Sequence, residues 1–440
     1  MSLRDFIDQA AASGDLVTIA KPVSVEYEVA NVAHALEGRP ILFEQIAGYP
    51  GWRVLSGPCS DRRYFSMALD VPVEELVHHL AGALEDPADP PLVTSAPCQE
   101  VVVEEFDLHD LPILLHLPED AGYYIASNVV ITEDVEFGRN MSYHRLLRLD
   151  EHRFAARIVE QRGTDSALGK TKGDLPVAIC IGVSLATHLA ASMSPEPGVD
   201  ELAVANALAP TPLVRCLTND LAVPADAEIV MEGRITSQRH REGPFMDLTE
   251  TMDIEREQPV IEIDLITHRR DPIFHALLPG GLEHKLLMGM PREPTIFATV
   301  NQVATCTGVN ITPGGASWLH AVVRIKKQGP EDGRRAIEAA FRGHSSLKHV
   351  WVVDEDVDIF DPAAVEWAMA TRFQADKDLY VFPDRPGSSL DPSGKHVPGE
   401  KSRTTKMGLD CTIPWGANPD KFQKGRYGDV DVDDYLNGGE

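Results

Sequence analysis

Apolar positions recur along the chain with two different periods, and the changes between them predict three regions. In residues 3–12 the apolar side chains follow the i, i+3, i+4, i+7 spacing of one helix face. Similar segments alternate with short apolar runs as far as the proline-rich stretch 86–98, which is typical of a linker. We therefore expect an N-terminal α/β domain over residues 1–98. Its helices should cover 3–12, 27–37, 61–70 and 73–83, and its strands 16–19, 40–44 and 52–55.

From about residue 100 apolar and polar positions alternate, which is the period of half-buried strands. The segment 126–160 predicts a three-stranded meander with polar turns at 134–139 and 150–152. Many strands with few helices favour an antiparallel, barrel-like domain over residues 99–315. The expected strands are 101–105, 126–133, 140–149, 152–160, 177–183, 228–236, 259–268 and 272–277, with a short helix at 185–193.

After about residue 315 helices and strands alternate again, which predicts a β-α-β-α-β domain over residues 316–440. We expect Gly343 to end the first of its helices in a left-handed cap, and Asp361 to cap the second. Residues 384–408 have the composition of a basic loop. The acidic tail from residue 428 should be frayed.

The charge balance excludes several classes of partner. Asp and Glu number 68 against 40 Lys and Arg, so the formal net charge is −28 and the field repels nucleic acid and anionic membrane surfaces. No apolar run approaches the length of a membrane span, and the charged N-terminus lacks the core of a signal peptide. The six cysteines are far apart in sequence, so we expect reduced thiols in a cytoplasmic protein.

Three short segments carry candidate chemistry. In 241–247 (REGPFMD), Glu242 and Asp247 flank a Gly-Pro turn that could direct both acids toward one cavity, although a solvated hairpin has the same pattern. Arg145 lies on an expected half-buried strand and needs an anionic partner, either for function or as a structural ion pair. Lys406, beside Gly408 in the basic segment, could hold a phosphate or lie in a surface loop.

Taken in order, these segments resemble the UbiD family of reversible decarboxylases, which use prenylated FMN. EGPFMD resembles the family's acid motif, and Asn140 with Arg145 matches its N-x-x-x-x-R motif. RIVEQRG at 157–163, PGVDE at 197–201 and TKMGLD at 405–410 resemble three further family segments. The resemblance extends over nearly the whole chain and implies a mixed α/β (α+β) fold whose middle domain is a split β-barrel that binds the flavin.

The resemblance also implies roles for individual residues. Arg145, Glu242 and Asp247 would form the catalytic Glu–Arg–acid network. Asn140, Gln161 and Glu201 would ligate a divalent metal, usually Mn²⁺, with K⁺ as a further candidate ion. Many family members have His where this chain has Gln161, whose neutral oxygen still suits a hard cation. The cofactor-binding set would be Asn140, Ser142, Tyr143, His144, Arg145, Arg157, Ile158, Val159, Gln161, Arg162, Gly163, Ser192, Met193, Glu201 and Lys406.

The expected function is non-oxidative, reversible decarboxylation of an α,β-unsaturated or (hetero)aromatic acid. One alternative is a phosphorylated unsaturated acid of isoprenoid precursor synthesis, which would require surplus cations near the mouth of the pocket. The other is a catalytically silent flavin-binding protein, against which the presence of Arg145, Glu242 and Asp247 argues. The resemblance further implies a flavin prenyltransferase that supplies the cofactor, and a homodimer or homohexamer.

Overall fold

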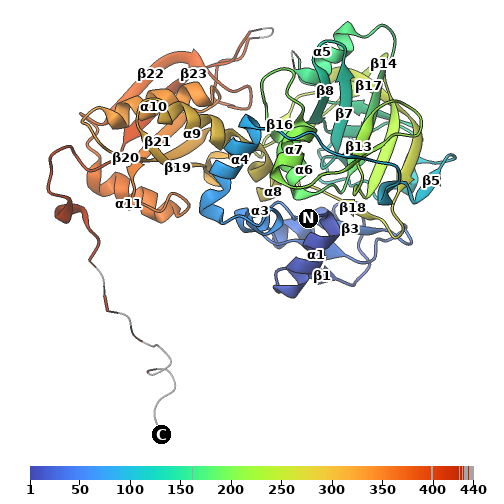
Figure 1. Cartoon of the computed structure of the whole chain (residues 1–440), viewed down its shortest axis with the longest axis horizontal. Helices are drawn as coiled ribbons and strands as arrows, with labels where there is room; N and C mark the ends of the chain where they lie inside the picture. The colour runs from blue at the N-terminus through green and yellow to red at the C-terminus, as the bar shows by residue number, and fades with distance from the viewer. Residues whose placement is uncertain (161, 398–399, 426, 429, 431–434, 436–440) are drawn as a thin grey trace.

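The computed structural model describes residues 1–160, 162–397, 400–425, 427, 428, 430 and 435, and Figure 1 shows an N-terminal, a middle and a C-terminal region. Helix and strand alternate in the N-terminal and C-terminal regions, whereas strands dominate the middle. The mixed α/β prediction is confirmed. Among the described residues, no helix has both the length and the apolar character needed to cross a bilayer.

The N-terminal region packs its helices against a small sheet. Helix α1 (Leu3–Ala12) has the predicted bounds, and a capping box between Ser2 and Asp5 fixes its start. The sheet has the order β1-β2-β3-β18, and its last strand, β18 (Ile273–His275), arrives from much later in the chain. The other elements are β1 (Val17–Ile19), α2 (Glu28–Ala35), β2 (Ile41–Phe43), β3 (Arg53–Ser56), α3 (Arg62–Leu69), η1 (Val73–Glu75) and α4 (Leu76–Glu85).

The middle region is built on a nine-stranded sheet of order β6-β9-β10-β17-β14-β11-β7-β8, with β5 also paired to β17. The long strands β14 (Ile229–Glu242) and β17 (Arg256–His268) form its centre. The remaining strands are β5 (Val101–Val103), β6 (Tyr124–Ile125), β7 (Val129–Asp134), β8 (Gly138–Tyr143), β9 (Leu146–Arg148), β10 (Arg153–Ala156) and β11 (Leu175–Ile181). Helices α5 (Gly163–Lys170), α6 (Leu185–Ser192) and α7 (Glu201–Leu208) accompany it.

The sheet curls so that its two ends adjoin. β8 is the last strand at one end and β9 is the second strand at the other, yet only His144 and Arg145 separate them in sequence. Two intervening residues can span at most roughly 11 Å between the flanking Cα atoms. The single strand expected at 140–149 is therefore wrong: the chain leaves one edge of the sheet and joins the other, and Arg145 lies at that seam.

The C-terminal sheet has the order β19-β20-β21-β23-β22 and packs against α9, α10 and α11. Its first strand, β19 (Thr305–Ile311), precedes the residue 316 at which we expected this region to begin. The other elements are α8 (Leu282–Gly289), η4 (Met290–Arg292), α9 (Glu293–Asn301), β20 (His320–Lys326), α10 (Asp332–Gly343), β21 (His349–Asp354), α11 (Pro362–Arg372), β22 (Leu379–Pro386) and β23 (Arg403–Asp410). In Figure 1, α4 lies between this region and the middle one.

Two expectations about the C-terminal region are wrong. Residues 403–410 form β23, between β21 and β22, so Lys406 lies on a strand and not in a surface loop. Gly343 is helical and does not cap α10 in the left-handed conformation. A Cβ on Gly343 would lie 2.7 Å from the Cα of Ile296, so the absence of a side chain permits close packing of α10 on α9. Most of the acidic tail lies outside the described residues.

Candidate active site

Arg145 at the sheet seam forms two hydrogen bonds with the carboxylate of Glu242. Its Nε lies 2.7 Å from Oε1 and its Nη2 lies 3.1 Å from Oε2. Glu242 is the last residue of β14 and its side chain is fully buried. Tyr124 on β6 donates its hydroxyl to Oε1 at 3.1 Å and accepts the N–H of Gly243 at 3.0 Å. The burial of Glu242 rules out a solvated hairpin at this position.

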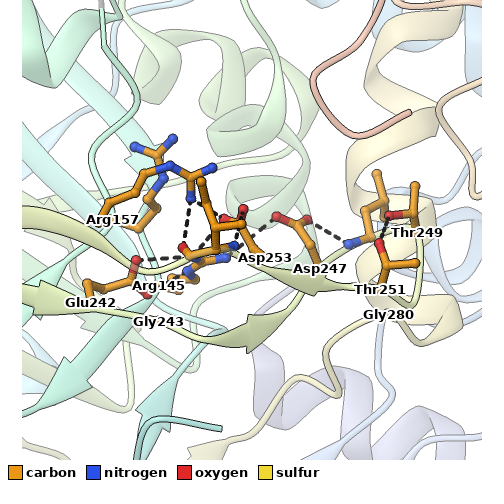
Figure 2. Close-up of polar contacts among 12 residues, drawn as sticks. Arg145, Arg157, Glu242, Gly243, Asp247, Thr249, Thr251, Asp253 and Gly280 are labelled. Atoms are coloured by element: carbon orange, nitrogen blue, oxygen red, sulfur yellow. Dashed lines mark hydrogen bonds and ion pairs between the residues drawn. The ribbon is translucent and has the colours of Figure 1, made fainter. Parts of the chain in front are cut away.

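Three carboxylates surround the Arg145 guanidinium (Figure 2). Besides Glu242, Asp253 lies 2.9 Å from Nη2 and Asp247 lies 3.5 Å from Nη1. Burial alone would lower the pKa of Arg145, but the hydrogen bond and charge of Glu242 and the two aspartates raise it. The guanidinium is therefore a permanent cation, and Asp253 is the member of this group that the sequence analysis missed.

Asp253 reaches Arg145 through a short hairpin. Strands β15 (Phe245–Met246) and β16 (Met252–Asp253) pair Phe245 with Asp253, which turns the chain back toward the seam. Arg256 also donates to Asp253, at 2.7 Å. Burial would raise the pKa of Asp253, but the hydrogen bond from Arg256 and the charge of Arg145 lower it. The Asp253-x-x-Arg256 spacing was the available sequence signal, although strands this short leave no periodic pattern.

Asp247 is more accessible than the other two acids, with 24% of its side chain exposed. Its Oδ1 accepts the N–H of Leu248 at 2.6 Å, which leaves Oδ2 toward Arg145. The ring of His284, at the start of α8, lies in the electrostatic field of Asp247 and Arg145, and burial lowers the pKa of this histidine. The N–H of Gly280 donates to His284 Nδ1 at 3.1 Å, so the neutral ring carries its proton on Nε2.

A second polar group lies on the other side of the seam. The Asn140 amide donates to Ser142 and to Thr164, each at 3.3 Å. His144 Nδ1 lies 3.0 Å from the carbonyl oxygen of Arg157, which can only accept, so Nδ1 carries the proton and Nε2 accepts from Thr164 at 2.9 Å. Burial lowers the pKa of His144 to about 4 and keeps the ring neutral. The side chains of Asn140, Ser142, His144 and Thr164 thus hold one another in fixed orientations.

Glu201, at the first turn of α7, lies next to this group. Its Oε2 accepts the N–H of Met141 at 2.9 Å, and burial raises the pKa of its carboxyl to about 7. A Cβ on Gly163 would lie 2.0 Å from Asn140 Oδ1, so only glycine allows α5 to begin this close to Asn140. Gln161 lies outside the described residues. Among those described, no group of three His, Cys, Asp or Glu side chains is arranged to hold a metal, so an ion here would depend on amide oxygens.

The remaining expected cofactor residues are divided between exposed and fully packed positions. Val159 is 46% exposed, which suits a residue that lines a cavity, whereas Ile158 is buried and donates its N–H to Gln258. Arg157 bonds the carbonyl of Ile158 at 2.7 Å. Ser192 is buried and donates within its own helix to Leu189 at 2.8 Å, so its hydroxyl is already engaged. Met193, which follows it, is 4% exposed.

Half-buried Arg292 and buried Lys406 form a third group of cations. Arg292 donates to Ser194 at 2.6 Å and Lys406 to the carbonyl of Ser345 at 2.7 Å, and no ion pair joins either to a carboxylate within the described ranges. Burial, then Arg162, lowers the pKa of Arg292 to about 10, and burial, then Lys401, lowers that of Lys406 to about 8.

His344 connects these two cations electrostatically. Burial, followed by the charges of Arg292 and Lys406, lowers its pKa to about 3. Two buried nitrogens here, Arg292 Nε and His344 Nε2, have no hydrogen-bond partner in the described part of the chain. The unpartnered Nε–H of Arg292 and the positive charge of the two cations together define a site for an anion. Sequence analysis missed Arg292, whose segment GMPREP has no periodic pattern.

Family models match almost the whole chain. They are the N-terminal, Rift-related and C-terminal domains of 3-octaprenyl-4-hydroxybenzoate carboxy-lyase, at residues 7–84, 92–282 and 285–411. Anhydromevalonate phosphate decarboxylase of Methanosarcina mazei is 42% identical over 94% of this chain and 96% of that protein. The enzyme of that name from Methanothermobacter thermautotrophicus is 39% identical over 96% and 99%.

Solved structures agree with this assignment. The UbiD-class enzyme HmfF from Pelotomaculum thermopropionicum, in complex with FMN, superposes with a TM-score of 0.94 at 38% identity, over 99% of this chain and 100% of that one. An evolved dimeric form of HmfF, in complex with prFMN, gives a TM-score of 0.90. The chain belongs to the UbiD family, and it is a decarboxylase.

Proposed function

We propose that the protein decarboxylates a phosphorylated α,β-unsaturated acid, anhydromevalonate phosphate, with prenylated FMN as its cofactor. The observation that carries the substrate class is a second cation: besides Lys406, half-buried Arg292 also forms no ion pair with a carboxylate of the described residues. One phosphate belongs to the cofactor, and a second anion site is needed only if the substrate also bears a phosphate. The first HmfF structure supports the flavin, and the relatives from two methanogens support the substrate.

The described residues fit a flavin phosphate with a divalent ion. Lys406 offers an ammonium whose described hydrogen-bond partner is the carbonyl of Ser345, and so it has capacity for a phosphate oxygen. Asn140 and Glu201 bring an amide and a carboxylate to one place, and Gln161 is the third proposed ligand. Oxygen donors of this kind suit Mn²⁺ or Mg²⁺. We keep K⁺ as a further candidate ion.

Arg145 is placed to hold the carboxylate that leaves as CO₂. Its guanidinium is fixed by Glu242 and Asp253 and is only 11% exposed, so a substrate carboxylate would meet a desolvated and oriented cation. When bound, prenylated FMN would supply an electron sink for the electron pair that the carboxylate leaves behind as CO₂ departs. The chain itself has to orient the acid, exclude water and return a proton to the carbon that loses CO₂.

Asp247 is our proposed proton carrier. Asp253 is held ionised by two arginines, and Glu242 is committed to Arg145 and Tyr124. Asp247 has the longest separation from Arg145 and the greatest exposure of the three acids, so it can exchange its proton with solvent between turnovers. The division of labour is that Glu242 and Asp253 fix the cation while Asp247 moves the proton.

Decarboxylation of an unphosphorylated unsaturated or (hetero)aromatic acid is the second candidate. It uses the same Arg145 cluster and leaves Arg292 without an anionic partner. The supply of cofactor by a flavin prenyltransferase is part of either proposal. So is a homo-oligomer, for which the dimeric form of HmfF is a precedent.

A substrate comparison tests the proposal. The protein is co-expressed with a flavin prenyltransferase, and CO₂ release is measured with anhydromevalonate phosphate and with the same acid lacking its phosphate. We expect kcat/KM to be at least about 100-fold higher for the phosphorylated acid, because two charge-assisted hydrogen bonds supply roughly 3 kcal/mol or more. Equal rates on both acids would favour the second candidate.

A further inference from the structure

A row of hydrogen bonds runs from β8 of the middle sheet to β18 of the N-terminal sheet and on to α8. The hydroxyl of Tyr143, on β8, bonds His188 Nδ1 on α6. His188 Nε2 lies 3.1 Å from His275 Nδ1 on β18, and His275 Nε2 lies 3.0 Å from Glu283 Oε1 on α8. The four residues come from four different elements, and the chemistry at Arg145 uses none of them.

The direction of every bond in this row follows from its acidic end. Glu283 accepts the N–H groups of Gly57 and Cys59, each at 3.0 Å, and these contacts favour the ionised, accepting carboxylate. His275 must therefore donate from Nε2, which leaves its Nδ1 as an acceptor. The same reasoning makes His188 a donor at Nε2 and an acceptor at Nδ1.

Tyr143, at the other end, must then be the donor. With both histidines neutral, one arrangement of protons satisfies all three bonds, and it points from the phenol to the carboxylate. The side chain of His275 is fully buried and that of Glu283 is 3% exposed, so water does not compete for these bonds. Burial lowers the pKa of His188, which agrees with a neutral ring.

The row joins two parts of the candidate active site. Tyr143 immediately precedes His144 and Arg145 at the seam. Glu283 immediately precedes His284, whose ring lies in the field of Asp247. The orientation of the Tyr143 phenol is thus coupled, through rigid and desolvated rings, to the beginning of α8.

We propose that Tyr143, His188, His275 and Glu283 form a positioning chain. Glu283 fixes the tautomers of both histidines, which commits the Tyr143 proton to His188 and leaves only oxygen lone pairs for the flavin. Tyr143 therefore cannot donate a hydrogen bond to the bound flavin, and the negative end of the chain makes the phenol oxygen electron-rich. The effect on the flavin rests on the proposed cofactor and on its contact with Tyr143, which the family resemblance implies.

The tautomers are tested first, without any flavin. In protein labelled with ¹⁵N-histidine, His188 and His275 should both show the Nε2–H tautomer, with assignments from His188→Gln and His275→Gln. The His188 signal should stay neutral between pH 6 and 8, because burial lowers the pKa of this ring. An Nδ1–H tautomer at either position would reverse the chain and overturn the inference.

The coupling to the flavin is tested with FMN alone. Glu283→Gln should raise the midpoint potential of bound FMN and shift its visible absorption, because the variant removes the negative charge at the end of the chain. In Tyr143→Phe protein the same substitution should have a much smaller effect, since the connection through the phenol is gone. Glu232→Gln is the matched control, because Glu232 is a buried glutamate that also accepts two backbone N–H groups, those of Leu217 and Thr218.

The outcomes separate the two proposals. If wild-type protein does not bind FMN, the proposed cofactor site fails and this inference fails with it. If FMN binds but Glu283→Gln behaves like Glu232→Gln, the positioning chain alone is wrong. A shift of equal size with and without the Tyr143 hydroxyl also overturns it, because Glu283 would then act directly through space.

Discussion

The two charged groups of the active site differ in their charge balance: one has more acids than cations, and the other has cations without acids. Around Arg145, three carboxylates meet one guanidinium, with Arg256 as a second cation at the edge. Half-buried Arg292 and buried Lys406 have no carboxylate partner among the described residues. An excess of acids can hold and release a proton, whereas an excess of cations favours the binding of an anion. The acidic group is therefore suited to the chemistry, and the basic group is suited to the recognition of phosphate.

Helix α8 connects the two groups. His284 lies near Asp247 at the start of this helix, and Arg292 ends the short η4 helix that follows it. They are eight positions apart, which at 1.5 Å per α-helical residue and about 2 Å per 3-10 residue is roughly 13 Å along the axis. A substrate with its acid at one end and a phosphate at the other can reach both groups. The length and the charge of a substrate should therefore together determine whether the enzyme accepts it.

The largest effect should come from the acidic group. Glu242→Gln keeps the shape of the side chain but removes the charge that fixes Arg145, and we expect turnover to fall by about 10²–10⁴-fold. FMN binding, measured by fluorescence titration, should stay within about threefold of wild type. Loss of both turnover and FMN binding would mean that Glu242 supports the fold of the site and has no separate role in the chemistry.

The roles of the two aspartates can be separated by isotope exchange. Solvent deuterium should enter the α-carbon of the decarboxylated product about 100-fold more slowly in Asp247→Asn protein, because the proton carrier is gone. Asp253→Asn should slow exchange by a smaller factor, since Glu242 still holds Arg145 at 2.7 Å. An Asp247→Asn variant that exchanges at the wild-type rate would make Glu242 the donor.

The basic group should respond to the phosphate of the substrate. Arg292→Gln removes a charge-assisted contact worth about 1.5–3 kcal/mol, so KM for anhydromevalonate phosphate should rise roughly 10- to 100-fold. The unphosphorylated acid serves as the control, and its kcat/KM should change by less than about threefold. Equal losses on both acids would place Arg292 outside the phosphate site.

The smallest effect concerns pH and the flavin phosphate. Lys406 has a pKa lowered to about 8, so in the free protein it loses its proton as the pH rises through that value. Phosphate binding needs the charged ammonium, and FMN affinity should fall by up to about tenfold per pH unit above pH 8. Lys406→Arg should remove this dependence, because guanidinium stays charged. An unchanged pH profile in Lys406→Arg would show that another group controls binding.

Much of the fold could be predicted because its pattern is local. The amphipathic face of α1 and the alternation along β14 and β17 give the correct elements within a few residues. Helix α7 was missed because apolar residues surround it on nearly every face, which removes the helical period. Strand β23 was missed because its sequence, RTTKMGLD, is polar at one end although Lys406 is buried.

The residues of the site could be predicted only where they lie in a recognisable sequence motif. Glu242 and Arg145 lie 97 residues apart, and no propensity argument pairs them; the resemblance did. Asp253 and Arg292 lie in segments without a motif or a periodic pattern, and their role depends on how the β15–β16 hairpin and η4 pack. Tertiary packing brings these groups together, so the Asp253-x-x-Arg256 spacing by itself could not have placed Asp253 beside Arg145.

The two-residue seam has a consequence for how the protein folds. The ion pair between Arg145 and Glu242 can form only after both ends of the nine-stranded sheet have come together. That closure requires contacts between residues far apart in sequence. Pairings of high sequence separation form slowly because the chain entropy of closing a long loop has to be overcome first. Catalytic competence should therefore appear in the last kinetic phase of refolding, together with the closure of the sheet. An insertion of even one residue between His144 and Arg145 should displace the guanidinium from the carboxylate of Glu242.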